Sequence, residues 1–175
     1  MSGIDSYTAL SGILGADDIK INDSGREWFE AVESGRTDYL PFLTTGYYLD
    51  TAINADEKGR AAILRQIIPD VREFDVKEYE LADPLGEKKF SPVPRFVHRY
   101  PDRALILVTD RCAMYCRHCF RRSFSGGMHG ALTDKELAAI TDYLAAHTEI
   151  KEILLTGGDP LTLPDSRLIS IIASI

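Results

Sequence analysis

The stretch Arg111–Phe120, RCAMYCRHCF, contains every cysteine of the chain. These are Cys112, Cys116 and Cys119, at C-x3-C-x2-C spacing. A structural zinc site or an ordinary iron–sulfur cluster uses four protein ligands. Three thiolates can hold three irons of a [4Fe–4S] cube and leave the fourth iron open, much as catalytic zinc keeps one open position. The missing fourth ligand therefore predicts a cluster that binds a small molecule.

The alternatives are a Cys3His zinc site that includes His118 and a chance cluster of core cysteines. His118 and Cys119 are adjacent in the chain, and neighbouring side chains converge poorly on one tetrahedral metal. Zinc motifs also usually consist of two pairs separated by a longer spacer, and this chain has no second pair. Both alternatives are therefore less favoured than the iron–sulfur cluster.

The bulk composition is that of a globular protein of 175 residues, with 45% hydrophobic residues and a formal charge of −7. The sequence has no apolar run of about 18 residues, so we expect no membrane span. It also lacks a secretory signal, and three clustered cysteines are not a disulfide framework, so we expect a cytoplasmic protein. The acidic charge argues against a nucleic-acid partner.

The first part of the chain is predicted to form short helices. The segment 24–35, SGREWFEAVESG, places Trp28, Phe29 and Val32 on one helical face and ends at a glycine. The segment 56–70 begins with a predicted cap at Asp56 and ends at Pro69. Its predicted core residues are Ala61, Ile63, Leu64, Ile67 and Ile68. A loop with four prolines, residues 81–103, follows and marks the predicted boundary of this helical region.

The pattern then changes to strand, helix, strand, helix. Residues 104–109 and 150–156 are short apolar runs, as expected for strands covered on both faces. Between them, residues 132–147 show a capping box, Thr133 with Glu136, and apolar residues at helical spacing. A second helix opens at Asp165. Two strands joined by such a helix predict a parallel βαβ unit of the α/β class, with the cysteines just after the first strand.

Two parallel strands do not make a stable sheet, and a full (β/α) barrel needs roughly 250 residues. We therefore expect the chain to be the N-terminal part of a longer protein. The predicted organisation is a helical region with its linker over residues 1–95, followed by the start of a (β/α) barrel, its first βαβα, over residues 96–175.

The cysteine motif, with Phe120 just after it, resembles the radical S-adenosylmethionine (SAM) superfamily. The wider string TDRCAMYCRHCFRRSF is similar to the lysine 2,3-aminomutase family, and the likeness includes VHRYPDRALILVT and LLTGGDPLTLPD. In that superfamily the open iron chelates the methionine part of SAM, and one electron then releases a 5′-deoxyadenosyl radical. The resemblance thus implies a partial radical SAM barrel as the fold, and a [4Fe–4S] cluster, SAM and pyridoxal 5′-phosphate (PLP) as cofactors.

Three groups of residues gain a role from this resemblance. The turn of Gly157, Gly158 and Asp159 is similar to the element that binds the amino group of SAM; taken alone, it would be an ordinary connection between a strand and a helix. Arg99, Tyr100 and Arg103 match residues that bind the PLP phosphate, and otherwise would belong to a solvated loop. Arg121 matches the arginine that binds the substrate carboxylate, whereas the arginines around the cysteines, Arg117 among them, could also compensate the charge of the cluster.

The function implied is that of an isomerase, a PLP-dependent 2,3-aminomutase that converts L-lysine to L-β-lysine. The resemblance also implies a flavodoxin-like or ferredoxin-like reductant and a homo-oligomer. A PLP-binding lysine has no match in residues 1–175 and is expected downstream, so no catalytic residue is assigned in this chain. The alternatives are an aminomutase for glutamate, a relative that supplies β-lysine for modification of a translation factor, and a non-catalytic iron–sulfur or zinc module. Ser123, where the family often has a third arginine, is a departure from the pattern.

Overall fold

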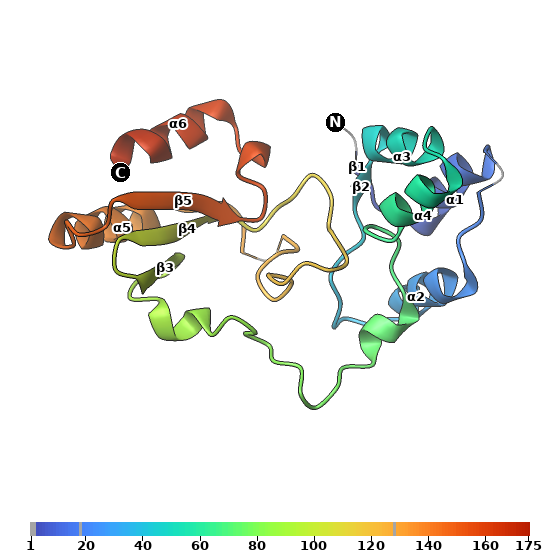
Figure 1. Cartoon of the computed structure of the whole chain (residues 1–175), viewed down its shortest axis with the longest axis horizontal. Helices are drawn as coiled ribbons and strands as arrows, with labels where there is room; N and C mark the ends of the chain where they lie inside the picture. Colours follow the sequence, from blue (N-terminus) through green and yellow to red (C-terminus); the bar gives the residue numbers. More distant parts are fainter. Residues whose placement is uncertain (1–2, 18, 128) are drawn as a thin grey trace. The chain divides into compact units, whose positions relative to one another are not determined.

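The computed structural model describes residues 3–17, 19–127 and 129–175, which form two compact units (Figure 1). The first unit comprises Met1–Glu80 and Ala113–Cys119, and the second comprises Leu81–Cys112 and Phe120–Ile175. Each unit has its own hydrophobic core. Within the described residues, no helix has the length and apolar character needed to cross a membrane.

The first unit is mainly helical. Its elements are β1 (Gly3–Ile4), α1 (Tyr7–Gly15), α2 (Asp23–Glu33), β2 (Thr44–Thr45), α3 (Gly46–Ile53), α4 (Glu57–Leu64) and the short 3-10 helix η1 (Val71–Phe74). Each α-helix follows a polar residue that accepts a hydrogen bond from the backbone N–H three positions later, as N-caps do. These caps are Ser6, Asn22, Thr45 and Asp56, so the predicted cap at Asp56 is confirmed.

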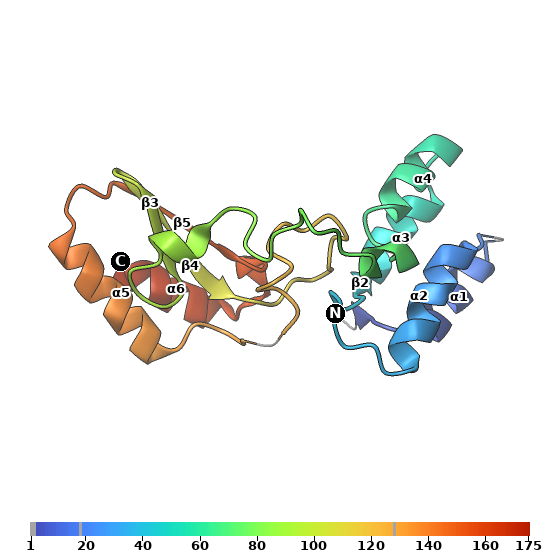
Figure 2. The same ribbon diagram turned by 90° about the horizontal axis from the view of Figure 1, so that it is seen from below.

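Trp28 and Phe29 of α2 lie in the core of the first unit, 1% and 6% exposed, and Val32 packs against that core, as predicted. Figure 2 shows α3 and α4 side by side, and the Arg60 side chain of α4 donates to the Ile53 carbonyl at the end of α3 over 2.9 Å. The core prediction for α4 is wrong at Ala61, which is exposed. The helix ends at Leu64, so helical spacing no longer applies to Ile67, which is fully buried beyond it.

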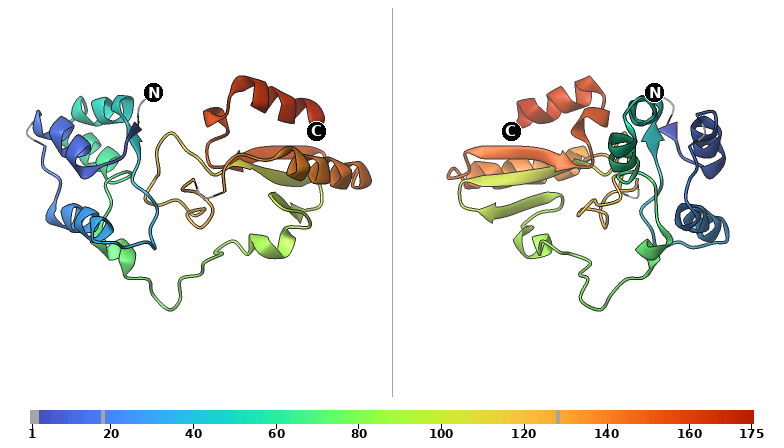
Figure 3. Two further views of the ribbon diagram at one scale, coloured as in Figure 1. Left: turned by 180° about the vertical axis from the view of Figure 1, so that it is seen from behind. Right: turned by 45° about the vertical axis from the view of Figure 1, so that its right-hand side comes forward.

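The second unit contains a three-stranded sheet. Its elements are η2 (Glu87–Phe90), β3 (Phe96–Tyr100), β4 (Arg103–Thr109), α5 (Asp134–Ala146), β5 (Glu152–Gly157), η3 (Pro160–Thr162) and α6 (Asp165–Ser174). The strand order is β3-β4-β5, with β3 antiparallel and β5 parallel to β4 (Figure 3). The parallel βαβ unit is therefore confirmed. Strand β3 was not predicted, because the proline-rich segment around it suggested a loop.

One face of the sheet is covered by helices. Ala104, Ile106 and Val108 alternate along β4 and are buried in one cluster with Ile140 of α5 and Ile171 of α6. Helix α5 starts at the predicted capping box, in which Thr133 and Glu136 exchange hydrogen bonds with each other's backbone. Both helices thus pack on the same face, as in a (β/α) barrel.

The prediction that both strands are covered on both faces is wrong for the other face of the sheet. Leu105 and Leu107 of β4 are only partly buried, and Leu154, which pairs with Leu105 in the ladder, is 46% exposed. A continuous apolar run shows that both faces are apolar, but it does not show what covers them. In a (β/α) barrel this second face points into the interior.

Candidate functional site

The site begins where β4 ends. The ladder to β5 pairs Leu107 with Thr156 and Thr109 with Gly157, so β4 has one extra residue, Val108, at this point. Such a bulge bends the strand locally and is common next to functional sites. Cys112 follows three residues after Thr109, and the bend therefore directs the chain into the cysteine loop.

The turn at Gly157 and Gly158 is attached to the start of this loop. The Gly158 N–H donates to the Thr109 carbonyl over 2.6 Å, and the Asp159 N–H donates to the Arg111 carbonyl over 2.8 Å. A Cβ on Gly158 would lie 2.1 Å from the Arg111 carbonyl oxygen, and one on Gly157 would lie 2.4 Å from the Thr109 carbonyl oxygen. Gly157 also has a φ of +108°, which favours glycine. Close packing against these two carbonyl groups therefore explains why both positions are glycine. Their predicted role in binding SAM stays a prediction.

Asp159 keeps one carboxylate oxygen available. Its Oδ1 accepts the Leu161 N–H over 2.9 Å and caps η3, whereas Oδ2 accepts no hydrogen bond from any described residue. The backbone bond to Arg111 fixes the residue beside the start of the cysteine loop. The arrangement thus offers an acceptor for a cation at the end of β5, and the role of Asp159 toward SAM stays a prediction.

Sequence reasoning missed Asp110, the residue after β4. It is fully buried, its Oδ2 accepts the His129 N–H, and its carbonyl accepts the Gly126 N–H over 3.1 Å. Its Oδ1 has no hydrogen-bond partner within the described part of the chain. Asp110 thereby holds the segment that follows the cysteines against the end of β4. The signal for it was a carboxylate directly after an apolar strand.

Cys116 and Cys119 lie in one turn of the first unit, in which the Cys119 N–H donates to the Cys116 carbonyl over 3.0 Å. Burial raises the pKa of the Cys116 thiol, and the negative charge of the Cys119 thiolate adds to the shift. Burial also raises the pKa of Tyr48 on α3, with a smaller contribution from the Cys116 thiolate. The hydrogen bond of this turn thus keeps the two cysteines of the first unit together.

The three cysteines, all within the described residues, form no disulfide and are partly buried. Cys112 belongs to the second unit and the other two to the first. Among the described residues, no three His, Cys, Asp or Glu side chains stand in an arrangement that could hold a single metal ion. The chemistry of the donors nevertheless fits an iron–sulfur cluster, since cysteine thiolates outside disulfides are its usual ligands.

Arg121 is 10% exposed and forms a two-bond ion pair with Glu87 of η2. Its Nη1 and Nη2 donate to the two carboxylate oxygens over 2.6 and 2.7 Å, and its guanidinium lies over the Phe120 ring. The Nε–H donates to no acceptor in the described ranges. The edge formed by Nε and Nη2 can therefore still bind a second carboxylate in the side-on geometry. Glu87 was not identified from the sequence.

The residues predicted to bind phosphate lie on the β3–β4 hairpin. Tyr100 and Arg103 are paired across the ladder, and both are exposed, as is Arg99. Arg99 donates to the Leu85 carbonyl over 3.1 Å, and Arg103 forms an exposed ion pair with Asp102. The hairpin and Cys112 lie beyond opposite ends of β4, a strand of 7 residues that spans roughly 20 Å. The structure therefore brings the three together, but not next to the start of the cysteine loop.

A family model described as the Radical SAM superfamily matches residues 106–175. Over these residues the chain is similar to this superfamily. The matched segment starts within β4 and includes the three cysteines and the turn of Gly157 and Gly158, so the predicted partial radical SAM barrel is confirmed.

Several L-lysine 2,3-aminomutases match most of the chain. It is 41% identical to the L-lysine 2,3-aminomutase of Fusobacterium nucleatum over 137 residues, which are 78% of this chain and 32% of that protein. It is 40% identical to the L-lysine 2,3-aminomutase of Clostridium subterminale over 136 residues, 78% of this chain and 32% of that one. The L-lysine 2,3-aminomutase of Bacillus subtilis is 40% identical over 132 residues, 75% of this chain and 28% of its own length.

The chain spans about a third of the length of these curated relatives. The family-model match and this likeness confirm the predicted resemblance to the N-terminal part of lysine 2,3-aminomutases. They also imply the predicted cofactors, a [4Fe–4S] cluster, SAM and PLP.

Proposed function

We propose that this radical SAM chain is the N-terminal part of a PLP-dependent amino acid 2,3-aminomutase, with L-lysine as substrate. The observation that supports the proposal most is the likeness to lysine 2,3-aminomutases at about 40% identity over three quarters of the chain. The enzyme is then an isomerase that moves an amino group between neighbouring carbons. A flavodoxin-like or ferredoxin-like reductant, a homo-oligomer and a cytoplasmic location are parts of the same proposal.

The cysteines and the turn after β5 have distinct tasks in this proposal. Cys112, Cys116 and Cys119 would hold three irons of a [4Fe–4S] cluster and leave its fourth iron available to SAM. When bound, the cluster supplies the electron that cleaves SAM to a 5′-deoxyadenosyl radical. Asp159 directs its unused Oδ2 toward the SAM amino group, and the backbone bonds of the turn keep that carboxylate in place.

Arg121 orients the substrate by its carboxylate. Glu87 occupies the end of the guanidinium, and the edge of Nε and Nη2 remains for the substrate. Paired donors in a fixed plane suit a carboxylate better than a single ammonium does. Arg121→Lys should therefore raise the KM for the amino acid by about tenfold, the loss of roughly one hydrogen bond to a charged group, and leave the iron content unchanged.

Arg99, Tyr100 and Arg103 bind the PLP phosphate in this proposal. Guanidinium and phenol groups are suitable donors to phosphate oxygens, and PLP when bound supplies a π-system that stabilises the migrating radical. The test is a titration of the protein with PLP, followed by the absorbance of the cofactor. Arg103→Gln should weaken PLP binding, and unchanged binding would remove the hairpin from the site.

The first experiment for the proposal is low-temperature EPR of the reconstituted, reduced protein, with and without SAM. A [4Fe–4S]+ signal that changes shape with SAM supports the open iron, and Cys116→Ala should abolish the signal. A signal that SAM does not change, or zinc in place of iron, contradicts the proposal.

The substrate is tested on the complete protein that carries this chain. Supplied with SAM, PLP and a reductant, it should form β-lysine from lysine and no β-glutamate from glutamate. If the protein forms β-glutamate from glutamate and no β-lysine from lysine, the proposed substrate is wrong and the proposed aminomutase reaction still holds.

A further inference from the structure

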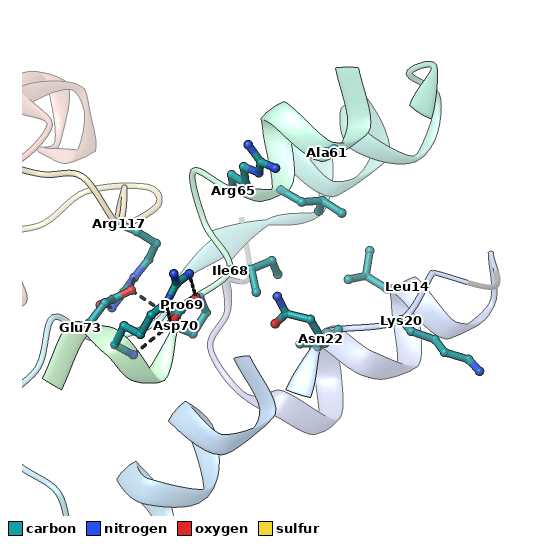
Figure 4. A pocket seen from close by; sticks show the side chains of 13 residues that line it. Leu14, Lys20, Asn22, Ala61, Arg65, Ile68, Pro69, Asp70, Glu73 and Arg117 are labelled. Carbon is teal, nitrogen blue, oxygen red and sulfur yellow. Dashed lines mark hydrogen bonds and ion pairs between the residues drawn. The ribbon is translucent and has the colours of Figure 1, made fainter. Parts of the chain in front are cut away.

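Arg117, between two of the cysteines, has a buried guanidinium in the first unit. The side chain is 6% exposed and pairs with Glu73 of η1, which is 14% exposed. Its Nε donates to Glu73 Oε1 over 2.9 Å, and its Nη2 donates to Glu73 Oε2. The remaining bonds go to the carbonyls of Leu40 and Pro41, each over 3.0 Å. Figure 4 shows Arg117 and Glu73 beside each other among the side chains that line one pocket of this unit.

The donors of this guanidinium are all used. An arginine has five N–H bonds, and Arg117 makes five hydrogen bonds, two to Glu73, two to Leu40 and one to Pro41. The face of the group lies over the Trp28 ring, 5.1 Å from its centroid. No N–H is therefore left for a cluster sulfur or a substrate, and the prediction that Arg117 compensates the charge of the cluster is not supported by its contacts.

The backbone on either side is attached to the same unit. The Tyr115 N–H donates to the Leu43 carbonyl over 3.0 Å, and the Arg117 N–H donates to the Gln66 carbonyl over 2.8 Å. Met114 packs against the core of the first unit. The segment that carries Cys116 is thereby fixed by backbone bonds on both sides, by an apolar contact and by a buried ion pair.

A buried charge stays in place only where its partners satisfy it. Removing one partner of a buried ion pair leaves the other charge without compensation, which costs much more than the pair contributes. Glu73 comes from a helix 44 positions earlier in the chain, so its pairing with Arg117 ties two distant segments together. The position of the turn with Cys116 and Cys119 thus depends on the helical N-terminal unit.

We infer that Arg117 is a positioning residue of the cluster: its ion pair with Glu73 holds Cys116 and Cys119 in the geometry that keeps iron bound. The inference rests on the proposed cluster but not on the aminomutase reaction or its substrate. It predicts that the N-terminal unit determines how firmly the iron is held, although none of its residues before Ala113 is a ligand.

The test compares Arg117→Met, Arg117→Lys and Glu73→Gln with the wild type after anaerobic reconstitution. Iron per chain and the rate of iron loss to a chelator are measured at low urea, where Trp28 fluorescence shows the first unit to be folded. The matched control is Arg26→Met, because Arg26 has two ion pairs on α2 but is 50% exposed. We expect iron loss at least fivefold faster for Arg117→Met and Glu73→Gln, and an intermediate rate for Arg117→Lys.

If Arg117 has only a structural role, these variants should be less stable but should lose iron from the folded protein at a rate within twofold of the wild type. That result would overturn the inference. If Arg117→Met does not fold, the same comparison is decided by Glu73→Gln, which keeps the shape of the pair. The variant Cys116→Ala distinguishes a failure of the proposed cluster from a failure of the proposed role of Arg117. Iron retained in that variant contradicts the proposed cluster, whereas iron lost there but kept normally in both pair variants contradicts only the role of Arg117.

Discussion

Substitution of Gly158 by alanine should disrupt the end of β5. The new Cβ would lie 2.1 Å from the Arg111 carbonyl oxygen, 2.6 Å from its carbon and 2.8 Å from the Arg111 nitrogen. All three are backbone atoms, so no side chain can turn away to make room. Either the turn or the start of the cysteine loop must move by about 1 Å, because unbonded carbon and oxygen atoms need more than 3 Å.

That movement would lengthen two hydrogen bonds, from Gly158 to Thr109 and from Asp159 to Arg111. Two backbone bonds contribute about 1 kcal/mol each, and an overpacked methyl group costs about 1–3 kcal/mol. We therefore expect Gly158→Ala to lower the free energy of unfolding of the second unit by about 3–5 kcal/mol.

Urea unfolding followed by two probes tests this value. Trp28 is the single tryptophan and reports on the first unit, whereas circular dichroism also reports on the second. Only the circular dichroism transition should shift in Gly158→Ala. The control is Gly12→Ala in α1, where a Cβ would meet nothing within 4 Å and should stabilise the helix by about 0.5–1 kcal/mol. A Gly158→Ala variant within 1 kcal/mol of the wild type would refute the packing argument.

Three further predictions concern stability. Arg95 has a φ of 62° and a largely buried ion pair with Glu136, so Arg95→Ala should lower the free energy of unfolding by about 3 kcal/mol. Arg95→Gly should lower it by about 1 kcal/mol less, because glycine relieves the backbone strain. Thermal unfolding of both variants measures these values. Thr133→Val should cost about 1 kcal/mol in urea unfolding, because it removes the cap of α5. The side-chain hydrogen bond from Arg72 lowers the pKa of Asp70, so its stabilisation is present at neutral pH and is lost as the pH falls below about 3.9, the unfolded value. Acid titration of Asp70→Asn should show a smaller loss of stability, and an unchanged acid transition would contradict this.

Local signals in the sequence predicted much of the fold. The cap at Asp56 and the capping box of Thr133 and Glu136 need only residues three positions apart, and both are present in the structure. The parallel pairing of β4 with β5 follows from the helix between them. Strand β3 was missed because its partner, not its own composition, makes Phe96–Tyr100 a strand.

Such local signals could not predict the long-range contacts that build the candidate site. Arg117 pairs with Glu73 over 44 positions and Arg121 pairs with Glu87 over 34. No periodicity relates residues at these separations, so a sequence pattern can nominate the arginines but not their partners. Gly158 is a similar case. The sequence suggested close approach of a ligand, and the structure shows close approach of the Arg111 backbone.

The open edge of strand β5 has a practical consequence. Among the described strands β5 pairs only with β4, so its other edge has no strand beside it. The strand also carries Leu154, which is 46% exposed. An unpaired apolar edge is a template for aggregation, so the 175-residue chain should be purified at low concentration. A peptide that supplies a complementary strand for the open edge of β5 should reduce this aggregation when it is expressed together with the chain.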